Sequence, residues 1–387
     1  MHWRSKLIHP RAHAPAGFRS LATPTFRGST VLFDRQGDVS DDWRQTEKGY
    51  SYGLYGTPTV LELGARIAEI EGAQHSFVVP GGQAAISLIY LAFCKTGSHA
   101  LVPVTAYGPN RELAAGLMQR LGVAVESYDP LIGAGIAALI RESTALIWVE
   151  SPGSVTMEIQ DVPAIVAAAR ARHVPVALDN TYAAGVLFDA FAHGVDVSMQ
   201  ALTKYVGGHS DLLLGTVSVA GSAAYETIGP VHKQLGMAVS PDDCSLALRG
   251  LQTLGVRLER LEKSALQVAR WLARHPKIET VLHPALPSCP GHAIWRRDFT
   301  GSASIFSIVF DAGCTAERVN GFADRLKLFR IGFSWGGVAS LVLIYPSLDR
   351  PGENYGGRLV RLNVGLEETS DLIADLDQAL DAMDAPA

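Results

Sequence analysis

Two residues of this sequence, Lys204 and Asp179, have the types and the placement that a carbonyl cofactor requires. Lys204 lies just behind an apolar run at 195–201, and Asp179, 25 residues earlier, follows an apolar run at 174–178. Pyridoxal phosphate (PLP) needs from a protein a lysine amine for its aldehyde and a carboxylate for its pyridine nitrogen. The pair therefore predicts a PLP site, with Lys204 as the Schiff-base residue.

The segment around Lys204 distinguishes it from an ordinary surface lysine. Most lysines are exposed, so a solvated Lys204 and a helix-capping Asp179 are the plain alternative. Here, however, Lys204 is followed by a turn at 207–210 that is rich in glycine and hydroxyl groups. Glycine allows backbone N–H groups to approach an anion closely. We therefore favour the cofactor interpretation.

The elements that must position these residues form an α/β pattern between residues 56 and 240. Short apolar runs predict strands at 77–79, 100–102, 123–125, 146–149, 174–178 and 195–199. Strands interleaved with helices of ten or more residues indicate a mostly parallel sheet covered on both faces. We expect this large domain to carry the cofactor.

The segments before and after this domain differ from it in residue composition and in apolar pattern. Residues 1–55 are rich in Arg, Gly, Ser, Thr and Pro and cannot bury a core, so we expect an arm that docks on another surface. Residues 241–387 contain a long helical pattern at 246–274, strand-like runs at 305–310, 341–344 and 359–364, and a final amphipathic helix at 370–383. This grouping predicts a smaller α+β domain.

Composition excludes several classes of partner. The chain has 387 residues, a net charge of −5 and no long basic run, so neither nucleic acid nor an anionic membrane is expected as a partner. We see neither a run long enough to span a membrane nor an apolar signal core, so we expect a cytoplasmic protein. The four scattered cysteines and the histidine spacing predict no structural metal.

Two glycine-containing segments could bind a phosphate. At 77–83, a strand, a tight turn and a helix start would bring the backbone N–H groups of Gly82 and Gln83 to bear on an anion, although a plain turn is the alternative. The segment 133–138 superficially fits a dinucleotide fingerprint, which would suggest a nicotinamide-dependent dehydrogenase. Four residues separate its first glycine from the preceding strand, so we reject that interpretation.

From about Thr23 to the C-terminus, the sequence resembles the Cys/Met-metabolism PLP enzymes, and within them the bacterial cystathionine β-lyases. This resemblance implies a PLP-dependent transferase-like fold (fold type I, aspartate aminotransferase-like). The matching stretches are 150–154, 179–185, 203–205, 248–251, 283–287, 334–337 and 361–365.

The resemblance assigns further roles around the cofactor. It implies that Tyr107 stacks on the pyridine ring and can move a proton, and that Arg361 binds the substrate α-carboxylate, flanked by Ser334 and Trp335. Besides Gly82 and Gln83 at the phosphate, it implies lesser contacts from Thr203 and Ser154, either of which could instead be a local cap.

The arm carries one match and one departure. Tyr52 resembles the tyrosine that reaches the phosphate in a neighbouring subunit, which implies an obligatory dimer and commonly a tetramer. Leu54 stands where most relatives have a phosphate-binding arginine. Either another cation of the arm, such as Arg44, takes its place, or the phosphate relies on helix and hydroxyl donors. Ser245 is a second departure, because it stands at about the place where the best-known β-lyases have a tyrosine; the resemblance therefore does not define the distal substrate pocket.

The resemblance implies a carbon–sulfur lyase that acts on a sulfur amino acid. The expected reaction is β-elimination of L-cystathionine to homocysteine, pyruvate and ammonia in methionine biosynthesis, with cysteine-S-conjugate lysis as a side activity. The alternative is a γ-eliminating or γ-replacing relative. Trp335 and Ala184 favour the β-lyase, because γ-enzymes usually carry leucine and threonine at these two positions.

Overall fold

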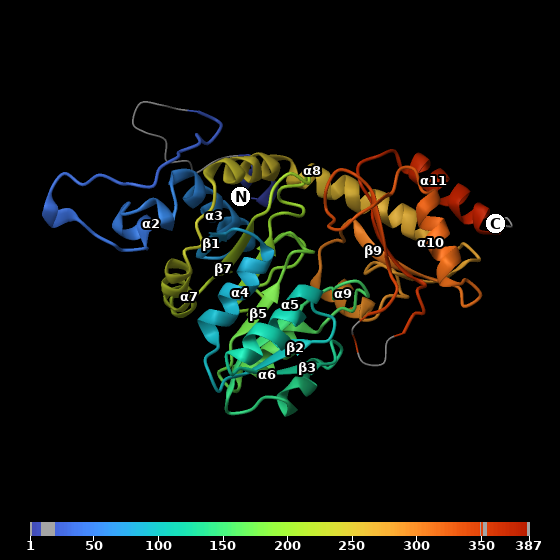
Figure 1. Ribbon diagram of the computed structural model, residues 1–387, viewed down its shortest axis with the longest axis horizontal. Helices are drawn as coiled ribbons and strands as arrows, with labels where there is room; N and C mark the ends of the chain where they lie inside the picture. Colours follow the sequence, from blue (N-terminus) through green and yellow to red (C-terminus); the bar gives the residue numbers. More distant parts are fainter. Residues whose placement is uncertain (1, 9–19, 349, 351–353, 385–387) are drawn as a thin grey trace.

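A computed structural model describes residues 2–8, 20–348, 350 and 354–384. The chain forms an N-terminal arm, a large α/β domain and a smaller α+β domain (Figure 1). Residues 20–55 of the arm lie on the side of the large domain away from the small domain. The long helix α8 (Pro241–Leu272), on which Trp3 and Arg4 pack, runs from the large domain into the small one. The described arm contains only short helical turns, α1 (Trp3–Lys6), η1 (Gln36–Asp38), α2 (Gln45–Lys48) and η2 (Gly53–Tyr55).

The large domain is built on a seven-stranded sheet with the order β1-β7-β6-β5-β4-β2-β3. Strand β7 runs antiparallel to its neighbours β1 and β6, and the other pairs are parallel, as the sequence predicts. The strands are β1 (His75–Val79), β2 (His99–Pro103), β3 (Ala124–Tyr128), β4 (Thr144–Glu150), β5 (Val176–Asp179), β6 (Val197–Ala201) and β7 (Gly215–Val219).

Helices cover both faces of this sheet, because its central strands are apolar on both sides. One face packs against α4 (Gly82–Phe93), α7 (Ser222–Leu235) and the segment formed by α5 (Gly108–Leu113) and η3 (Ala114–Met118). The other face packs against α3 (Pro58–Glu71), α6 (Val162–Arg170) and α8. The two apolar layers hold the strand ends in fixed positions.

The small domain has a five-stranded sheet with the order β10-β11-β12-β9-β8. Its strands are β8 (Ile278–Leu282), β9 (Ile305–Phe310), β10 (Arg330–Ile331), β11 (Leu341–Tyr345) and β12 (Leu359–Asn363). The C-terminal half of α8, α10 (Ala316–Arg325) and α11 (Thr369–Asp381) pack on it, and α9 (His292–Asp298) precedes β9. Within the described part of the chain, no helix is both long and apolar enough to cross a membrane.

The topology explains why the predicted residues converge. Strands β1, β2, β4, β5 and β6 all end at the same edge of the large sheet, since β7 is antiparallel to both β1 and β6. Ligands of open α/β sheets bind at this carboxyl edge. The segment 133–138 forms only a 3-10 helix, η4 (Gly133–Ala138), and four residues separate it from the end of β3, which agrees with the rejection of a dinucleotide fold.

Candidate active site

A cavity of about 340 Å³ opens at the carboxyl edge of the large sheet. Most of the residues that the sequence singles out line it: Gly82, Gln83, Tyr107, Ser154, Asp179, Thr203, Lys204, Trp335 and Arg361. They come from the ends of several strands of the large domain and from two segments of the small domain. The cavity therefore lies between the two domains.

Lys204 extends from a tight turn after β6. The turn is closed by the N–H of Gly208, which donates to the carbonyl of Lys204 at 2.8 Å, and by the N–H of Gly207, which donates to Leu202. The ammonium nitrogen of Lys204 donates to Ser334 Oγ at 2.7 Å and lies 5.4 Å from the ring centroid of Trp335. Burial lowers the pKa of Lys204 to about 8; the charge of Arg361 adds to this effect, and that of Asp179 opposes it.

Asp179 is the last residue of β5 and is 9% exposed. One carboxylate oxygen accepts the N–H of Thr181 at 3.0 Å, and the hydroxyl of Thr181 accepts the N–H of Ala201 at 2.9 Å. Burial raises the pKa of Asp179, while the donors of Thr181 and the charge of Lys204 oppose the rise. A buried carboxylate needs a cationic or hydrogen-bonding partner, which a protonated ring nitrogen would supply.

One end of the cavity is formed where β1 leads into α4. Gly81 precedes the helix with φ 154°, and the first helical residue is Gly82. A Cβ at Gly82 would lie 2.8 Å from the Cβ of Ala201, and one at Gly215 would lie 2.5 Å from the carbonyl oxygen of Gly81. Both glycines are therefore required for close packing, which leaves the first N–H groups of α4 directed at the cavity.

The residues from the small domain lie opposite the lysine. Arg361, on β12, donates to the carbonyl of Ser334 at 3.3 Å, and its guanidinium carbon lies 5.5 Å from the ring centroid of Tyr345. Ser334 has a left-handed φ of 75°, which turns its hydroxyl toward Lys204. Burial lowers the pKa of Arg361, but a guanidinium remains charged at neutral pH. The site thus offers a planar cation for a carboxylate.

Tyr107 lies just past β2, at the start of α5, and its side chain is 44% exposed in one chain. Its backbone N–H donates to Glu150 Oε2 at 2.7 Å. Burial raises the pKa of its phenol, and the charge of Asp179 raises it further. Tyr107 is therefore a protonated phenol at neutral pH.

Three of the predicted residues need comment. Ser154 and Thr203 reach the cavity, but the carbonyl of Ser154 accepts from Arg350, and the hydroxyl of Thr203 bonds with Leu214 at 3.2 Å. Tyr52 does not line this cavity: it is 46% exposed, and its carbonyl accepts from Gln45 at 2.8 Å. Within one chain, Tyr52 is not brought together with the other site residues.

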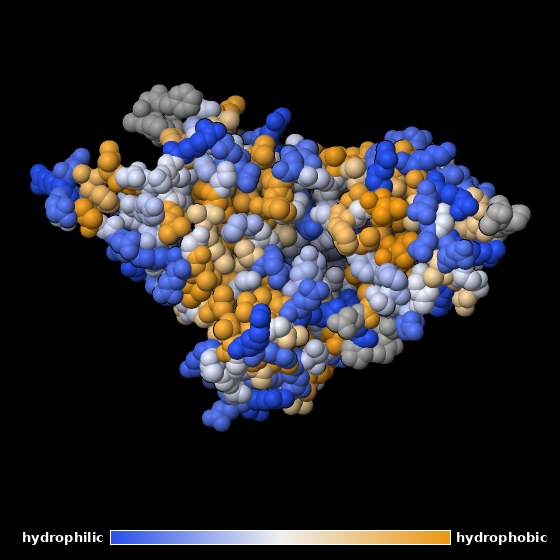
Figure 2. Space-filling model, viewed as in Figure 1, coloured by the Kyte–Doolittle hydropathy of each residue, from blue (hydrophilic) through white to orange (hydrophobic). Residues whose placement is uncertain are grey.

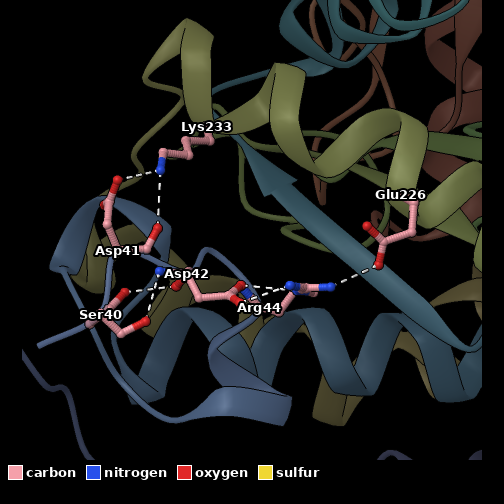
Figure 3. Close-up of polar contacts among 7 residues, drawn as sticks. Ser40, Asp41, Asp42, Arg44, Glu226 and Lys233 are labelled. Atoms are coloured by element: carbon pink, nitrogen blue, oxygen red, sulfur yellow. Dashed lines mark hydrogen bonds and ion pairs between the residues drawn. The ribbon is translucent and has the colours of Figure 1, made fainter. Parts of the chain in front are cut away.

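The arm is attached to its own subunit by polar contacts that involve Arg44 (Figure 3). Arg44 donates to both carboxylate oxygens of Asp42, at 3.0 and 2.8 Å, and to Glu226 of α7 at 3.3 Å. Beside it, Lys233 pairs with Asp41. Two carboxylates of the same chain thus neutralise Arg44, which argues against Arg44 as the replacement for the arginine missing at Leu54.

Sequence reasoning missed three residues that shape the site. Arg257, 5% exposed on α8, donates to the carbonyl of Tyr205 at 2.6 Å and so holds the turn that carries Lys204. Arg350 donates to the hydroxyl of Thr156 and to the carbonyl of Ser154, and so holds the loop that contains these two residues. Glu150 ends β4 inside the cavity. Only Glu150 carried a sequence signal, as an acidic residue at a strand end.

Fold and site together define a PLP-dependent enzyme of fold type I. The residues fit the cofactor: a lysine of lowered pKa, a buried carboxylate and a glycine-lined helix N-terminus converge in one cavity. Residues 4–381 match the Cys/Met metabolism PLP-dependent enzyme family, and the chain belongs to that family.

Curated relatives and solved structures support this classification. The chain is 43% identical to a putative cystathionine beta-lyase of Rhizobium johnstonii, over 94% of this chain and 91% of that protein. It is also 43% identical to cystathionine beta-lyase MetC of Escherichia coli, over 91% of each. A crystal structure of cystathionine gamma synthase from Xanthomonas oryzae pv. oryzae, in complex with aminoacrylate and cysteine, matches with a TM-score of 0.91 and 27% identity, covering 99% of this chain and 98% of that chain.

The lowered pKa of Lys204 predicts how the apoenzyme captures PLP. Only the neutral amine attacks an aldehyde, so below a pKa of about 8 the capture rate should rise roughly tenfold per pH unit and then level off. Stopped-flow mixing of apoenzyme with PLP measures this rate. The rate with Nα-acetyl-lysine, expressed per neutral amine, corrects for ionisation of PLP itself. A corrected rate that still rose tenfold between pH 9 and 10 would show an ordinary lysine and contradict the assignment.

Proposed function

We propose that this protein is a carbon–sulfur lyase that cleaves L-cystathionine by β-elimination. With one water, the products are homocysteine, pyruvate and ammonia. The observation that carries the proposal is the meeting of the Lys204 amine, the Asp179 carboxyl and the Arg361 guanidinium in one cavity. Relatives at 40–43% identity that bear the name cystathionine beta-lyase support the choice of substrate.

Each residue has a role that follows from its position. When bound, PLP withdraws electrons from the substrate Cα. Arg361 holds the α-carboxylate with two donors in one plane, and so orients the Cα–H bond. Lys204, as the free amine, removes the Cα proton. Asp179, a buried carboxylate of the cavity, would keep a proton on the ring nitrogen.

The remaining residues of the proposal fix the cofactor and the substrate. Gly82 and Gln83 present the helix N-terminus to the phosphate, and Thr203 and Ser154 border the cavity. Tyr107 would stack on the ring and, as a protonated phenol, would protonate the departing thiolate. Ser334 and Trp335 contact the amine of Lys204 and flank the carboxylate of the substrate.

We further propose that two subunits share each site. Tyr52 lies outside its own cavity, on an arm that extends away from the small domain (Figure 1). Large apolar side chains are exposed in one chain, among them Leu32 at 89%, Leu213 at 70% and Phe333 at 84%. Figure 2 shows apolar side chains at the surface of both domains, on either side of a hollow. Such surfaces suit a subunit contact, so an obligatory dimer and a homotetramer belong to the proposal.

A cytoplasmic location is also proposed, because scattered cysteines without paired spacing suit a reducing compartment. The γ-eliminating or γ-replacing alternative shares the fold, as the γ-synthase structure demonstrates, so the fold cannot separate the two reactions. Trp335 and Ala184 favour β-elimination.

A pair of substrates tests the proposal. The purified holoenzyme is given either L-cystathionine or an O-acylated homoserine with cysteine. A β-lyase consumes the first and forms no cystathionine from the second, because an O-acylated homoserine has its leaving group on the γ-carbon. Formation of cystathionine from the second pair would contradict the proposal.

Leu54 gives a separate prediction about PLP retention. A charge-assisted bond to the phosphate is worth about 1.5–3 kcal/mol, so its absence corresponds to roughly ten- to hundredfold weaker binding. Leu54→Arg should therefore slow the loss of PLP on dialysis by about this factor, if the side chain reaches the neighbouring phosphate. Leu54→Met is the control, since it changes shape without adding charge. Unchanged retention in Leu54→Arg would show that this position does not contact the phosphate.

A further inference from the structure

Two carboxyl groups lie side by side in the cavity, at the ends of β4 and β5. Glu150 is the last residue of β4, Asp179 is the last of β5, and the two are paired in the parallel register of these strands. Residues paired on neighbouring strands point to the same face of a sheet. Both line the cavity and are nearly buried, at 8% and 9% exposed. The proposed chemistry uses only Asp179, so the second carboxyl requires an explanation.

Glu150 connects β4 to the loop that carries Tyr107. Its Oε2 accepts the backbone N–H of Tyr107 at 2.7 Å, at the point where the chain turns from β2 into α5. The Tyr107 residue is 44% exposed in one chain. To stack on the cofactor, its ring has to be held over the cavity. The Glu150 carboxyl thus fixes the backbone from which this ring extends.

The surroundings of the two carboxyls differ in a way that decides which one ionises. Asp179 faces the ammonium of Lys204 and accepts from Thr181. Burial raises the pKa of Glu150 well above its ordinary value, and the charge of Asp179 raises it further, against the N–H of Tyr107 and the charges of Arg350 and Arg111. Arg361 of the small domain lines the same cavity. Ionising both of these neighbouring carboxyl groups in a buried site has a high free-energy cost, so one of them retains its proton.

We propose that Glu150 is a positioning residue that works as an uncharged carboxylic acid. It anchors the backbone of Tyr107 through its acceptor oxygen, and it leaves Asp179 as the ionised member of the pair. This inference rests on the proposed PLP site, and it extends that proposal by giving Glu150 a role.

The test compares Glu150→Gln with Glu150→Ala in the holoenzyme. The first readout is the pH titration of the visible absorbance of bound PLP. Glutamine keeps the acceptor oxygen and is uncharged, so the titration midpoint should stay within about half a pH unit of the native value. An ionised Glu150 within roughly 10 Å of the titrating group of bound PLP would raise the pKa of that group by on the order of one unit, at an effective dielectric constant of about 20. A fall of the midpoint by more than half a unit in Glu150→Gln would therefore overturn the uncharged state.

The second readout is the rate at which PLP is lost on dialysis. Glu150→Ala removes the acceptor for Tyr107, so PLP should be lost about two- to tenfold faster, while Glu150→Gln should retain it as the native protein does. Native retention in a folded Glu150→Ala variant would overturn the anchoring role. Glu112→Gln, an exposed carboxylate on α5, is the control for removing a nearby solvated charge. Both readouts concern PLP binding, so failure of the cystathionine assay would refute the proposed substrate without affecting this test.

Discussion

The variant Lys204→Ala should lose the visible absorbance of bound PLP and nearly all turnover. Alanine supplies no amine for the aldehyde and no base for the substrate Cα proton. A positioned proton transfer alone contributes about 10²–10⁴-fold, so we expect a fall in turnover of at least roughly 10³-fold. Absorbance of the dialysed protein and the rate of keto-acid formation measure the two effects.

The outcome is interpretable only if the variant folds. In one chain, Lys204 donates to Ser334 at 2.7 Å, and burial disfavours its charge, so its removal should not unfold the domain. Circular dichroism and the melting temperature check this point. Lys95→Ala, at an exposed position, is the matched control and should behave as the native protein. A folded Lys204→Ala variant with native absorbance and turnover would refute the assignment of the whole site.

Asp179→Asn should retain PLP yet lose turnover by roughly 10²–10⁴-fold. The amide has the same shape and still accepts the N–H of Thr181, but it carries no charge to keep a proton on the pyridine nitrogen. Without that proton, the ring withdraws electrons poorly from the substrate. Steady-state kinetics, with the PLP content measured for each sample, separates the loss of turnover from the loss of cofactor.

Asp196→Asn provides a matched control, because Asp196, just before β6, bonds to the opposite end of β5. Asp196 accepts the N–H of Val176 at 2.8 Å, so it is also a carboxylate bonded to the backbone at an end of β5, but it lies away from the cavity. It should be nearly neutral for turnover. Native turnover in Asp179→Asn would mean that another carboxylate acts on the ring nitrogen, and Glu150 would then be the first residue to examine.

The positions of Asp179 and Lys204 could be predicted from the sequence because each residue follows an apolar run. The runs at 174–178 and 195–199 correspond to β5 and β6, each shifted by one or two residues, so Asp179 and Lys204 were placed correctly. The resemblance added Arg361 and Tyr107, and both line the cavity. The turn at 77–83, whose residues Gly82 and Gln83 also line it, was visible as a strand, turn and helix start. Strand ends and local motifs are visible in a single sequence, since they depend on neighbouring residues.

Other features depend on contacts between distant segments and could not be predicted in this way. The register of β4 and β5, which pairs Glu150 with Asp179, is not visible in either strand alone. Arg257 stands in a regular helical pattern, and only the packing of α8 shows that it holds the Lys204 turn. Strand β7 is short and contains small and hydroxyl residues, so it carried no clear apolar signal. The ion pairs of Arg44 likewise needed the position of α7.

One measurement tests the central claim most directly. L-Cystathionine is labelled with ¹³C in its three-carbon half only, and the keto acid formed by the holoenzyme is identified by mass spectrometry. Cleavage between sulfur and the β-carbon predicts labelled pyruvate together with unlabelled homocysteine. Unlabelled 2-oxobutyrate with labelled cysteine would show cleavage on the γ side of sulfur and would contradict the proposed β-elimination.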